Sequence, residues 1–483
     1  MNWTWIRPFG LLAALAAVSA MAPAPTSPPV NPGAQAGASG EIKCSRLADN
    51  KRSTWNPQAN RVTLDYRTDL PTTAPATSRP WLGSYETDWQ AYMASVLAEV
   101  RASGADISGG RVRMPRSASW WAAPWMDYDT SGREYLNGLT KERGPDAGDI
   151  GPNSRKGPQV WAVGFYNAEG ASALRQVYTD ACNPTVPADW GFATGSISFK
   201  FLFTDATAKD APYLDGAPEI DGAIDAPGSS SARLPVVRRT VQKLRLIQMD
   251  IAVRDPASPT GWVFGTYIWK GRPGQGAFEG LVPVGLQWGN DPGKTADPLG
   301  GFIDARETRL NDDLAGHVWQ GADEVWPQRP FPGFQGRLNG PADNRVSSCL
   351  SCHALAQWPR STNGLLTRTP WETLERSPEA RRALVSDYMR NTRSGELAFP
   401  DEARSRPGWG GARPLDYALQ VESGMSRLCS ACKQGDLPGA TPAVCRIEGA
   451  PAFAYVPEAT CPRARNALFK LFSRRDETPL ARQ

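Results

Sequence analysis

Histidine is rare in this chain: there are only two in 483 residues, His317 and His353. Four nitrogen or sulfur ligands at the spacing of a zinc finger or ribbon cannot be assembled around one histidine, which excludes a structural zinc site of that kind. Lysine and arginine form no dense run, and the formal charge of +4 is small for a chain of this length. Nucleic acids and anionic membrane surfaces are therefore not indicated as partners.

Long apolar segments are missing beyond the N-terminus. A membrane-spanning helix needs about 20 predominantly apolar residues, and no later segment has them, so no stable membrane insertion is expected. The N-terminal stretch Phe9–Val18 follows Arg7 and precedes small residues, which is the pattern of a cleaved export signal. We expect residues 1–22 to be the signal peptide of a periplasmic or otherwise exported protein, and the Pro- and Ala-rich residues 23–40 to be a flexible linker.

Catalytic motifs are absent between residues 110 and 300. The sequence there has no phosphate-binding glycine loop, no nucleophile elbow and no cluster of histidine with carboxylates. The glycine-rich stretch 271–276 lacks the strand-to-helix setting that a phosphate loop needs. This region therefore offers no candidate for catalysis.

Alternation of apolar and polar residues predicts strands in the same region. It places Ile247, Met249, Ile251 and Val253 on one face of a strand. Turn-rich segments separate the strands and no helix-length apolar repeat interrupts them, which favours an antiparallel sandwich or barrel over a parallel α/β sheet. The predicted strands lie at 161–166, 196–203, 247–253, 262–269 and 281–288.

Covalent haem attachment is the chemistry that the sequence indicates most directly, through Cys-Leu-Ser-Cys-His at 349–353. Each cysteine can add across one haem vinyl group to form a thioether, and the adjoining histidine then lies under the iron. Cys349 and Cys352 are therefore predicted to hold a haem c, with His353 as its proximal ligand. The alternative is a surface Cys-x-x-Cys disulfide beside a chance histidine. Haem c attachment is completed outside the cytoplasm, in agreement with the export signal.

The occupant of the sixth iron position decides between two kinds of function. A methionine or a second imidazole gives a six-coordinate electron carrier, whereas an open position admits peroxide, oxygen or nitric oxide. Small c-type cytochromes usually take a downstream methionine, which favours Met389 or Met425, while the scarcity of histidine favours His317. Each candidate also has a structural interpretation, as a hydrogen-bonded surface histidine or as a core methionine.

A second motif, Cys429-Ser-Ala-Cys432-Lys433, has the same cysteine spacing with lysine in place of histidine. It resembles the catalytic haem of the multihaem ammonia-forming nitrite reductases, in which lysine is the proximal ligand. Those enzymes carry several further Cys-x-x-Cys-His motifs, and this chain has one. A lysine must also lose its proton before it can bind iron. Alternatively, Cys445 and Cys461 tie Cys429 and Cys432 into two disulfides, since the six cysteines outside the first motif allow up to three.

The predicted organisation is α+β and multidomain. A β-rich domain spans 41–305 and contains one clear helix at 88–103, in which Thr87 is the candidate N-cap and Met93 lies on the apolar stripe. A mainly α-helical, cytochrome c-like domain spans 306–483. Its expected helices begin at Ser377-Pro378 and cover 415–433 and 466–472.

The chain resembles exported cytochrome c proteins in which one C-terminal Cys-x-x-Cys-His module follows a large domain without haem. The resemblance rests on the haem motif and on the patterns at 121–143, 161–167 and 336–341. It implies haem binding and electron transfer, and it implies no substrate.

Three functions follow from these patterns, and the first is our prediction. In it the protein passes single electrons to or from a redox protein partner, while its β-rich domain docks that partner or binds a small-molecule ligand. The second is a haem enzyme, peroxidase-like or oxygenase-like, that works at an open iron or at a Lys433-ligated haem. The third is a binding module in which haem is structural.

Overall fold

The structure is a computed structural model that describes residues 44, 64–124, 133–145, 147–151, 153–154, 158–226, 239–294, 303–314, 333–344, 347–360, 377–400, 412–433, 437, 439–446 and 460–461. The expected signal peptide at 1–22, the linker at 23–40, the C-terminal helix at 466–472 and His317 lie outside these residues. Within them, no helix is both long and apolar enough to cross a bilayer.

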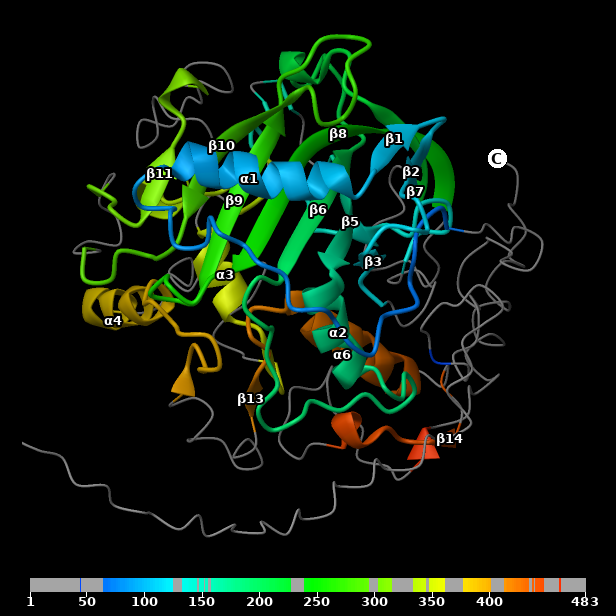
Figure 1. The fold of residues 1–483 in the computed structure, drawn as a ribbon, viewed down its shortest axis with the longest axis vertical. Coiled ribbons are helices and arrows are strands. Elements are labelled where there is room, and N and C mark those ends of the chain that lie inside the picture. The colour runs from blue at the N-terminus through cyan, green and yellow to red at the C-terminus, as the bar shows by residue number, and fades with distance from the viewer. Residues whose placement is uncertain are drawn as a thin grey trace, which may run out of the picture. The chain divides into compact units, whose positions relative to one another are not determined.

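A nine-stranded antiparallel sheet is the largest element of the described chain (Figure 1). Its main path runs β11-β10-β9-β8-β6-β5-β3, while β4 pairs with β5 and β7 with β8. The predicted β-rich antiparallel region is confirmed, but the described strands form one open sheet rather than two facing sheets or a closed barrel. The strands of this sheet are β3 (Trp120–Ala122), β4 (Thr140–Lys141), β5 (Val160–Asn167), β6 (Ile197–Thr204), β7 (Glu219–Asp225), β8 (Arg239–Arg254), β9 (Trp262–Trp269), β10 (Leu281–Gln287) and β11 (Thr308–Leu310).

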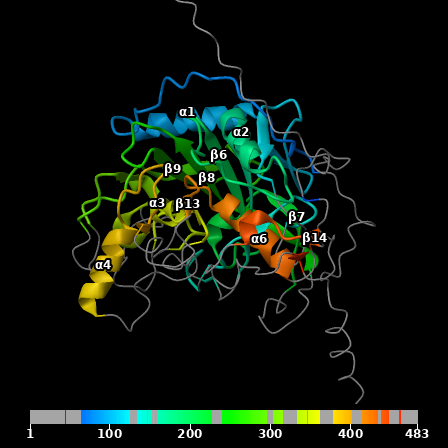
Figure 2. The same ribbon diagram turned by 90° about the horizontal axis from the view of Figure 1, so that it is seen from below.

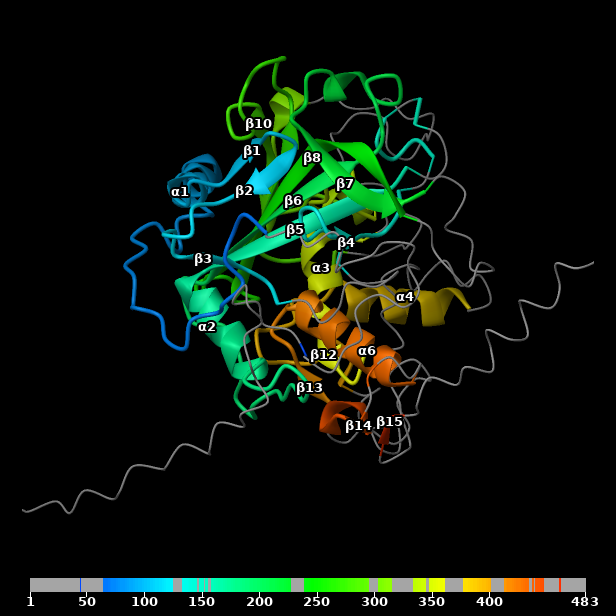
Figure 3. The same ribbon diagram turned by 90° about the vertical axis from the view of Figure 1, so that its right-hand side faces the viewer.

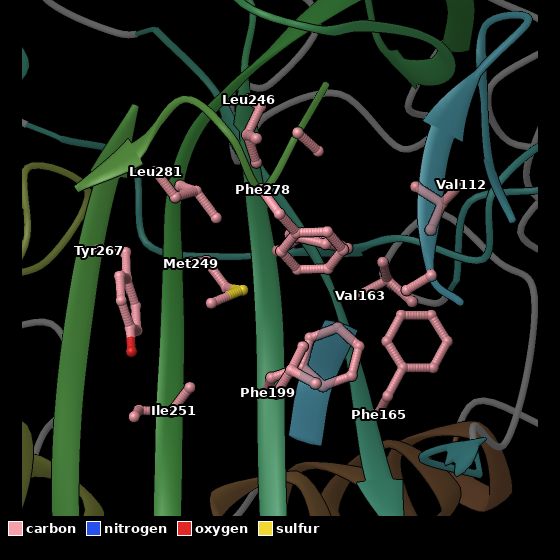
Figure 4. Packing of buried hydrophobic residues seen from close by; sticks show 14 of the residues in the cluster. Val112, Val163, Phe165, Phe199, Leu246, Met249, Ile251, Tyr267, Phe278 and Leu281 are labelled. Atoms are coloured by element: carbon pink, nitrogen blue, oxygen red, sulfur yellow. The ribbon is translucent and has the colours of Figure 1, made fainter. Parts of the chain in front are cut away.

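One face of the sheet packs on helix α1 (Trp89–Ala102) through a large aromatic and aliphatic core. Alternate side chains of β6, β8 and β9 form this face. Figure 4 shows Met249 of β8 beside Tyr267 of β9, and Phe199 of β6 beside Ile251 of β8. Met93 of α1 is fully buried in the same core, as expected of a residue on the apolar stripe.

A β-bulge interrupts the alternation of β8. Leu202 of β6 pairs with Gln248, but the next residue pairs with Leu246, so Ile247 is left without a partner across the strands. Ile247 therefore packs with Leu202 on the opposite face, while Leu246 and Met249 face α1. The prediction that Ile247 shares a face with Met249 is wrong, because one extra residue reverses the side-chain direction.

Two helices pack on the sheet: α1 lies across the face that includes β9 and β10, and α2 (Ala168–Val177) packs beside β3 and β5. Helix α1 is confirmed, although its N-cap is Asp88, whose side chain accepts a hydrogen bond from the backbone N–H of Ala91 at 3.0 Å, and not Thr87. Helix α2, between β5 and β6, contradicts the expectation that no helix interrupts the strands. Its buried face is rich in alanine, so the sequence showed no strong apolar repeat. Asn167 is its N-cap: the side-chain oxygen accepts a hydrogen bond from the backbone N–H of Gly170.

The face of the sheet away from α1 carries the C-terminal elements (Figures 2 and 3). Leu350 of α3 and Val421 of α6 belong to the same buried cluster as Phe264 of β9. The helix predicted from Ser377-Pro378 is confirmed, and the one predicted from 415 begins at Leu419. The helices here are α3 (Cys349–Ala354), α4 (Pro378–Tyr388) and α6 (Leu419–Lys433). Two small sheets accompany them, β12 (Gln357–Trp358) with β13 (Arg413–Pro414) and β14 (Gly439–Ala440) with β15 (Thr460–Cys461). A third two-stranded sheet, β1 (Asp106–Ser108) with β2 (Arg111–Arg113), follows α1.

Candidate functional site

The Cys-x-x-Cys-His motif forms the short helix α3. Ser348 caps it by accepting a hydrogen bond from the N–H of Ser351 at 3.0 Å, and the Ser348 hydroxyl lies 2.7 Å from Oδ1 of Asn290. On a helix, residues three and four positions apart share one face. Cys349, Cys352 and His353 therefore lie together, and all three line one cavity of about 460 Å³.

Both thiols of α3 are free, whereas the other six cysteines of the chain form three disulfides. Burial raises the pKa of the Cys349 thiol well above its usual value and that of Cys352 to about 12, and the neighbouring Asp343 carboxylate adds to both shifts. A dithiol that works by thiol–disulfide exchange needs the opposite shift, because the thiolate is the nucleophile. The site is thus poorly suited to dithiol redox chemistry.

His353 is held in the state that a metal ligand requires. Its Nδ1 lies 3.0 Å from the backbone carbonyl of Tyr417. A carbonyl only accepts, so Nδ1 carries the proton and Nε2 keeps its lone pair. Burial lowers the pKa of His353 to about 4, with a further contribution from Lys200, which keeps the ring neutral at pH 7. The ring also packs on Phe264, with 4.8 Å between centroids.

The cavity has aromatic walls and charged groups along its lining. Trp262, Phe264 and Tyr417 contact one another with centroids 6.0–6.3 Å apart on the His353 side. Its volume lies within the range of about 300–1,000 Å³ that is usual for cofactor and ligand sites. The cationic side chains in the lining are Lys141, Arg143, Lys200, Arg360 and Arg427.

A row of residues with little apolar surface, the polar row, crosses the sheet at the cavity. Gly164, Lys200, Asp250 and Thr266 are in register across β5, β6, β8 and β9. Thr266 donates to Asp250 at 3.0 Å, and the Lys200 ammonium lies 3.9 Å from Asp250 and 3.8 Å from Glu142. Burial opposes the charge of Lys200, but these carboxylates outweigh it and raise its pKa. Burial and the nearby Asp343 raise the pKa of Asp250.

The structure does not bring the methionine candidates to His353. Met389 is buried in a separate cluster with Val385 and Tyr388, and its sulfur accepts a hydrogen bond from the Ser351 hydroxyl at 3.1 Å. Met425 is buried in the core on α6. The described residues that line the cavity include neither methionine nor a second histidine.

The second motif lies in the last turns of α6, and both of its sulfurs are in disulfides. Cys429 pairs with Cys445, and Cys432 pairs with Cys461, while Lys433 is exposed at the end of the helix. Sulfurs that are paired in this way cannot form thioethers. The structure therefore corrects the hypothesis of a second haem at Cys429, Cys432 and Lys433 in favour of the disulfide alternative.

Several residues of the site were not predicted from the sequence. The fold brings the Tyr417 carbonyl and the Phe264 ring into contact with His353. It also places the polar-row residues Lys200 and Asp250 in the lining of the same cavity. Lys200 and Asp250 occupy the polar positions that alternate with the apolar ones along β6 and β8, so the sequence did not distinguish them from residues that face solvent.

No protein-family model, curated protein or solved structure matches this chain. Within the described ranges, no group of three or more His, Cys, Asp or Glu side chains is arranged to hold a metal ion directly. The donor set of α3 does fit a haem. It supplies two free thiols for the vinyl groups and one neutral imidazole for the iron. The lining also holds cationic side chains of the kind that bind propionates, interspersed with the carboxylates of Glu142, Asp250, Asp343 and Asp416.

Proposed function

We propose that this chain is an exported haem c protein that passes single electrons between partners, with one haem joined to Cys349 and Cys352 and ligated by His353. The observation that carries the proposal is the state of the three side chains. The two free cysteines of the chain share a helix face with a histidine whose Nδ1 is engaged by Tyr417. Three disulfides elsewhere in the chain support an oxidising compartment.

The haem supplies a one-electron couple between ferric and ferrous iron. The protein's part is to hold the imidazole, to exclude water and to balance charge. Trp262, Phe264 and Tyr417 provide an apolar wall beside His353. Lys200 and Arg143 line the cavity and would offer positive charge to the carboxylates of the porphyrin. The helices α3 and α6 would form the haem module, and strands β5, β6, β8 and β9 would form the opposite wall of its cavity.

A haem enzyme with an open iron position is the second candidate function. Met389 and Met425, two of the candidates for that position, pack elsewhere, and the third, His317, lies outside the described residues. Lys200 and Asp250 place an acid and a base at the cavity, and such groups can move protons during catalysis. A reduced protein whose optical spectrum changes with carbon monoxide supports this candidate, and a low-spin spectrum that carbon monoxide leaves unchanged supports the carrier.

Intact mass after expression in a host competent for cytochrome maturation tests the proposal. The mature polypeptide is expected to carry the added mass of one haem, and Cys352→Ala is expected to lose covalent haem on a denaturing gel. The matched control is the double variant Cys432→Ala/Cys461→Ala, which removes a disulfide of α6 and is expected to retain the haem. Colourless wild-type protein with Cys349 joined to Cys352 would refute the proposal. A mass increase of two haems would contradict the disulfides of Cys429 and Cys432 and support a second haem there.

A further inference from the structure

The backbone that holds His353 has an unusual conformation. Asp416 and Tyr417 have φ values of 42° and 69°, in the left-handed region that residues other than glycine seldom adopt. This conformation precedes α6 and brings the Tyr417 carbonyl to Nδ1 of His353 at 3.0 Å. Two successive residues of this kind persist only where their surroundings hold them.

Hydrogen bonds to the Asp416 side chain stabilise this backbone conformation. The side chain is only 3% exposed and accepts three hydrogen bonds. One comes from the backbone N–H of Phe192 at 2.7 Å, one from the indole N–H of Trp262 at 2.8 Å and one from the Ser394 hydroxyl at 2.7 Å. These donors belong to the segment after α2, to β9 and to the segment after α4. Asp416 thus joins three distant parts of the chain to the peptide beside His353.

The Tyr417 side chain also fixes the position of the Asp416–Tyr417 backbone. Its hydroxyl donates to the carbonyl of Thr392 at 2.6 Å, and its ring is 6.0 Å from those of Trp262 and Phe264. Trp262 therefore binds Asp416 and contacts Tyr417, while Phe264 contacts both Tyr417 and His353.

We propose that Asp416 is a positioning residue that sets the donor strength of His353 toward haem iron, and through it the reduction potential. The inference rests on the proposed function. An Nδ1–H that donates to a well-placed acceptor makes the imidazole more basic, and a more basic ligand favours ferric iron. If the Tyr417 carbonyl turns away, the imidazole becomes a weaker donor and the potential rises.

Asp416→Asn is the variant that tests this step. Asparagine tolerates the left-handed backbone, so it preserves the local conformation better than alanine. It offers one acceptor oxygen where the carboxylate offers two, so one of the three donors then faces an NH₂ group. We expect the equilibrium constant for reduction to increase roughly tenfold, which is a rise of about 59 mV for one electron.

Asp255→Asn is the matched control. Asp255 is likewise buried and accepts three hydrogen bonds, from the N–H of Gly83 at 2.7 Å, the Tyr92 hydroxyl at 3.1 Å and the N–H of Ala257 at 3.0 Å, but it does not line the cavity. A loss of packing that is merely structural should affect both variants alike. We expect the control to keep the wild-type potential.

The outcomes separate the inference from the function on which it rests. Haem-loaded Asp416→Asn with the wild-type potential, or equal shifts in both variants, would overturn the role of Asp416 and leave the haem assignment intact. Wild-type protein without covalent haem would overturn both. If Asp416→Asn does not fold, Ser394→Ala removes one donor to the same carboxylate; a smaller rise in potential is then expected, and no rise counts against the proposal.

Discussion

Glu422 should make the stability of this protein depend on pH in a direction that its burial dictates. The side chain is 2% exposed on α6, where one oxygen lies 2.8 Å from Nε of Arg360 and the other accepts from the N–H of Gln357 at 3.3 Å. Burial raises the pKa of Glu422 to about 7, against the ordinary 4.5, although Arg360 opposes the shift. The folded protein thus holds a proton that the unfolded chain releases.

The sign and size follow from this difference in pKa. Between pH 4.5 and about 7 the folded state binds more protons than the unfolded state, so the free energy of unfolding falls as the pH rises. Each unit of pKa difference is worth about 1.4 kcal/mol. The stabilisation from Glu422 is therefore fully present below pH 4.5, and about 3 kcal/mol of it is lost by the time the pH has passed 7.

Urea unfolding at several pH values between 4.5 and 8 measures the effect. Glu422→Gln is expected to gain stability relative to the wild type as the pH rises, because glutamine does not ionise. Glu379→Gln is the control: Glu379 is exposed on α4, and its lowered pKa keeps it ionised across this window. Curves for the wild type and Glu422→Gln that run parallel over the whole range would refute the reasoning.

Two further predictions concern packing and cross-linking. Gly280→Ala should destabilise the fold by about 1–3 kcal/mol, because an added Cβ would overlap the ring of buried Trp269, whereas Gly144→Ala, with its nearest neighbour at 3.8 Å, should be close to neutral in the same denaturation assay. The double variant Cys432→Ala/Cys461→Ala opens a cross-link between residues 29 positions apart and should lose about 3 kcal/mol. A denaturation midpoint that is unchanged in either destabilising variant would contradict the corresponding prediction.

Local patterns predicted much of the fold because the forces behind them act over a few residues. The stripe of α1 and the alternation of β6 depend only on side-chain direction along one element, and these elements are where the sequence predicted them. The bulge at Ile247 and the helix α2 escaped prediction for the opposite reason. The bulge is set by pairing with β6, and the helix by packing of its small buried residues against distant parts of the chain rather than by an apolar repeat.

Some residues of the candidate site could likewise be predicted from the sequence, and others could not. Its two cysteines and one histidine were available from the sequence, because the spacing on α3 alone brings them to one helix face. Its disulfides needed the fold, since the six remaining cysteines permit several pairings and only proximity in space selects three. The methionine candidates failed to reach the cavity for reasons of packing that no spacing rule contains.

By itself, the sequence determined what is local: a Cys-x-x-Cys-His motif, which predicts haem attachment, an antiparallel β-rich region and the helix that begins at Ser377-Pro378. Only the tertiary structure decided that the Tyr417 carbonyl meets His353, that Asp416 joins three distant segments behind it, and that Lys200 and Asp250 lie at the same cavity. The physical reason is that these contacts connect residues far apart in the chain. Their geometry depends on how the sheet and helices pack together, which no short stretch of sequence encodes.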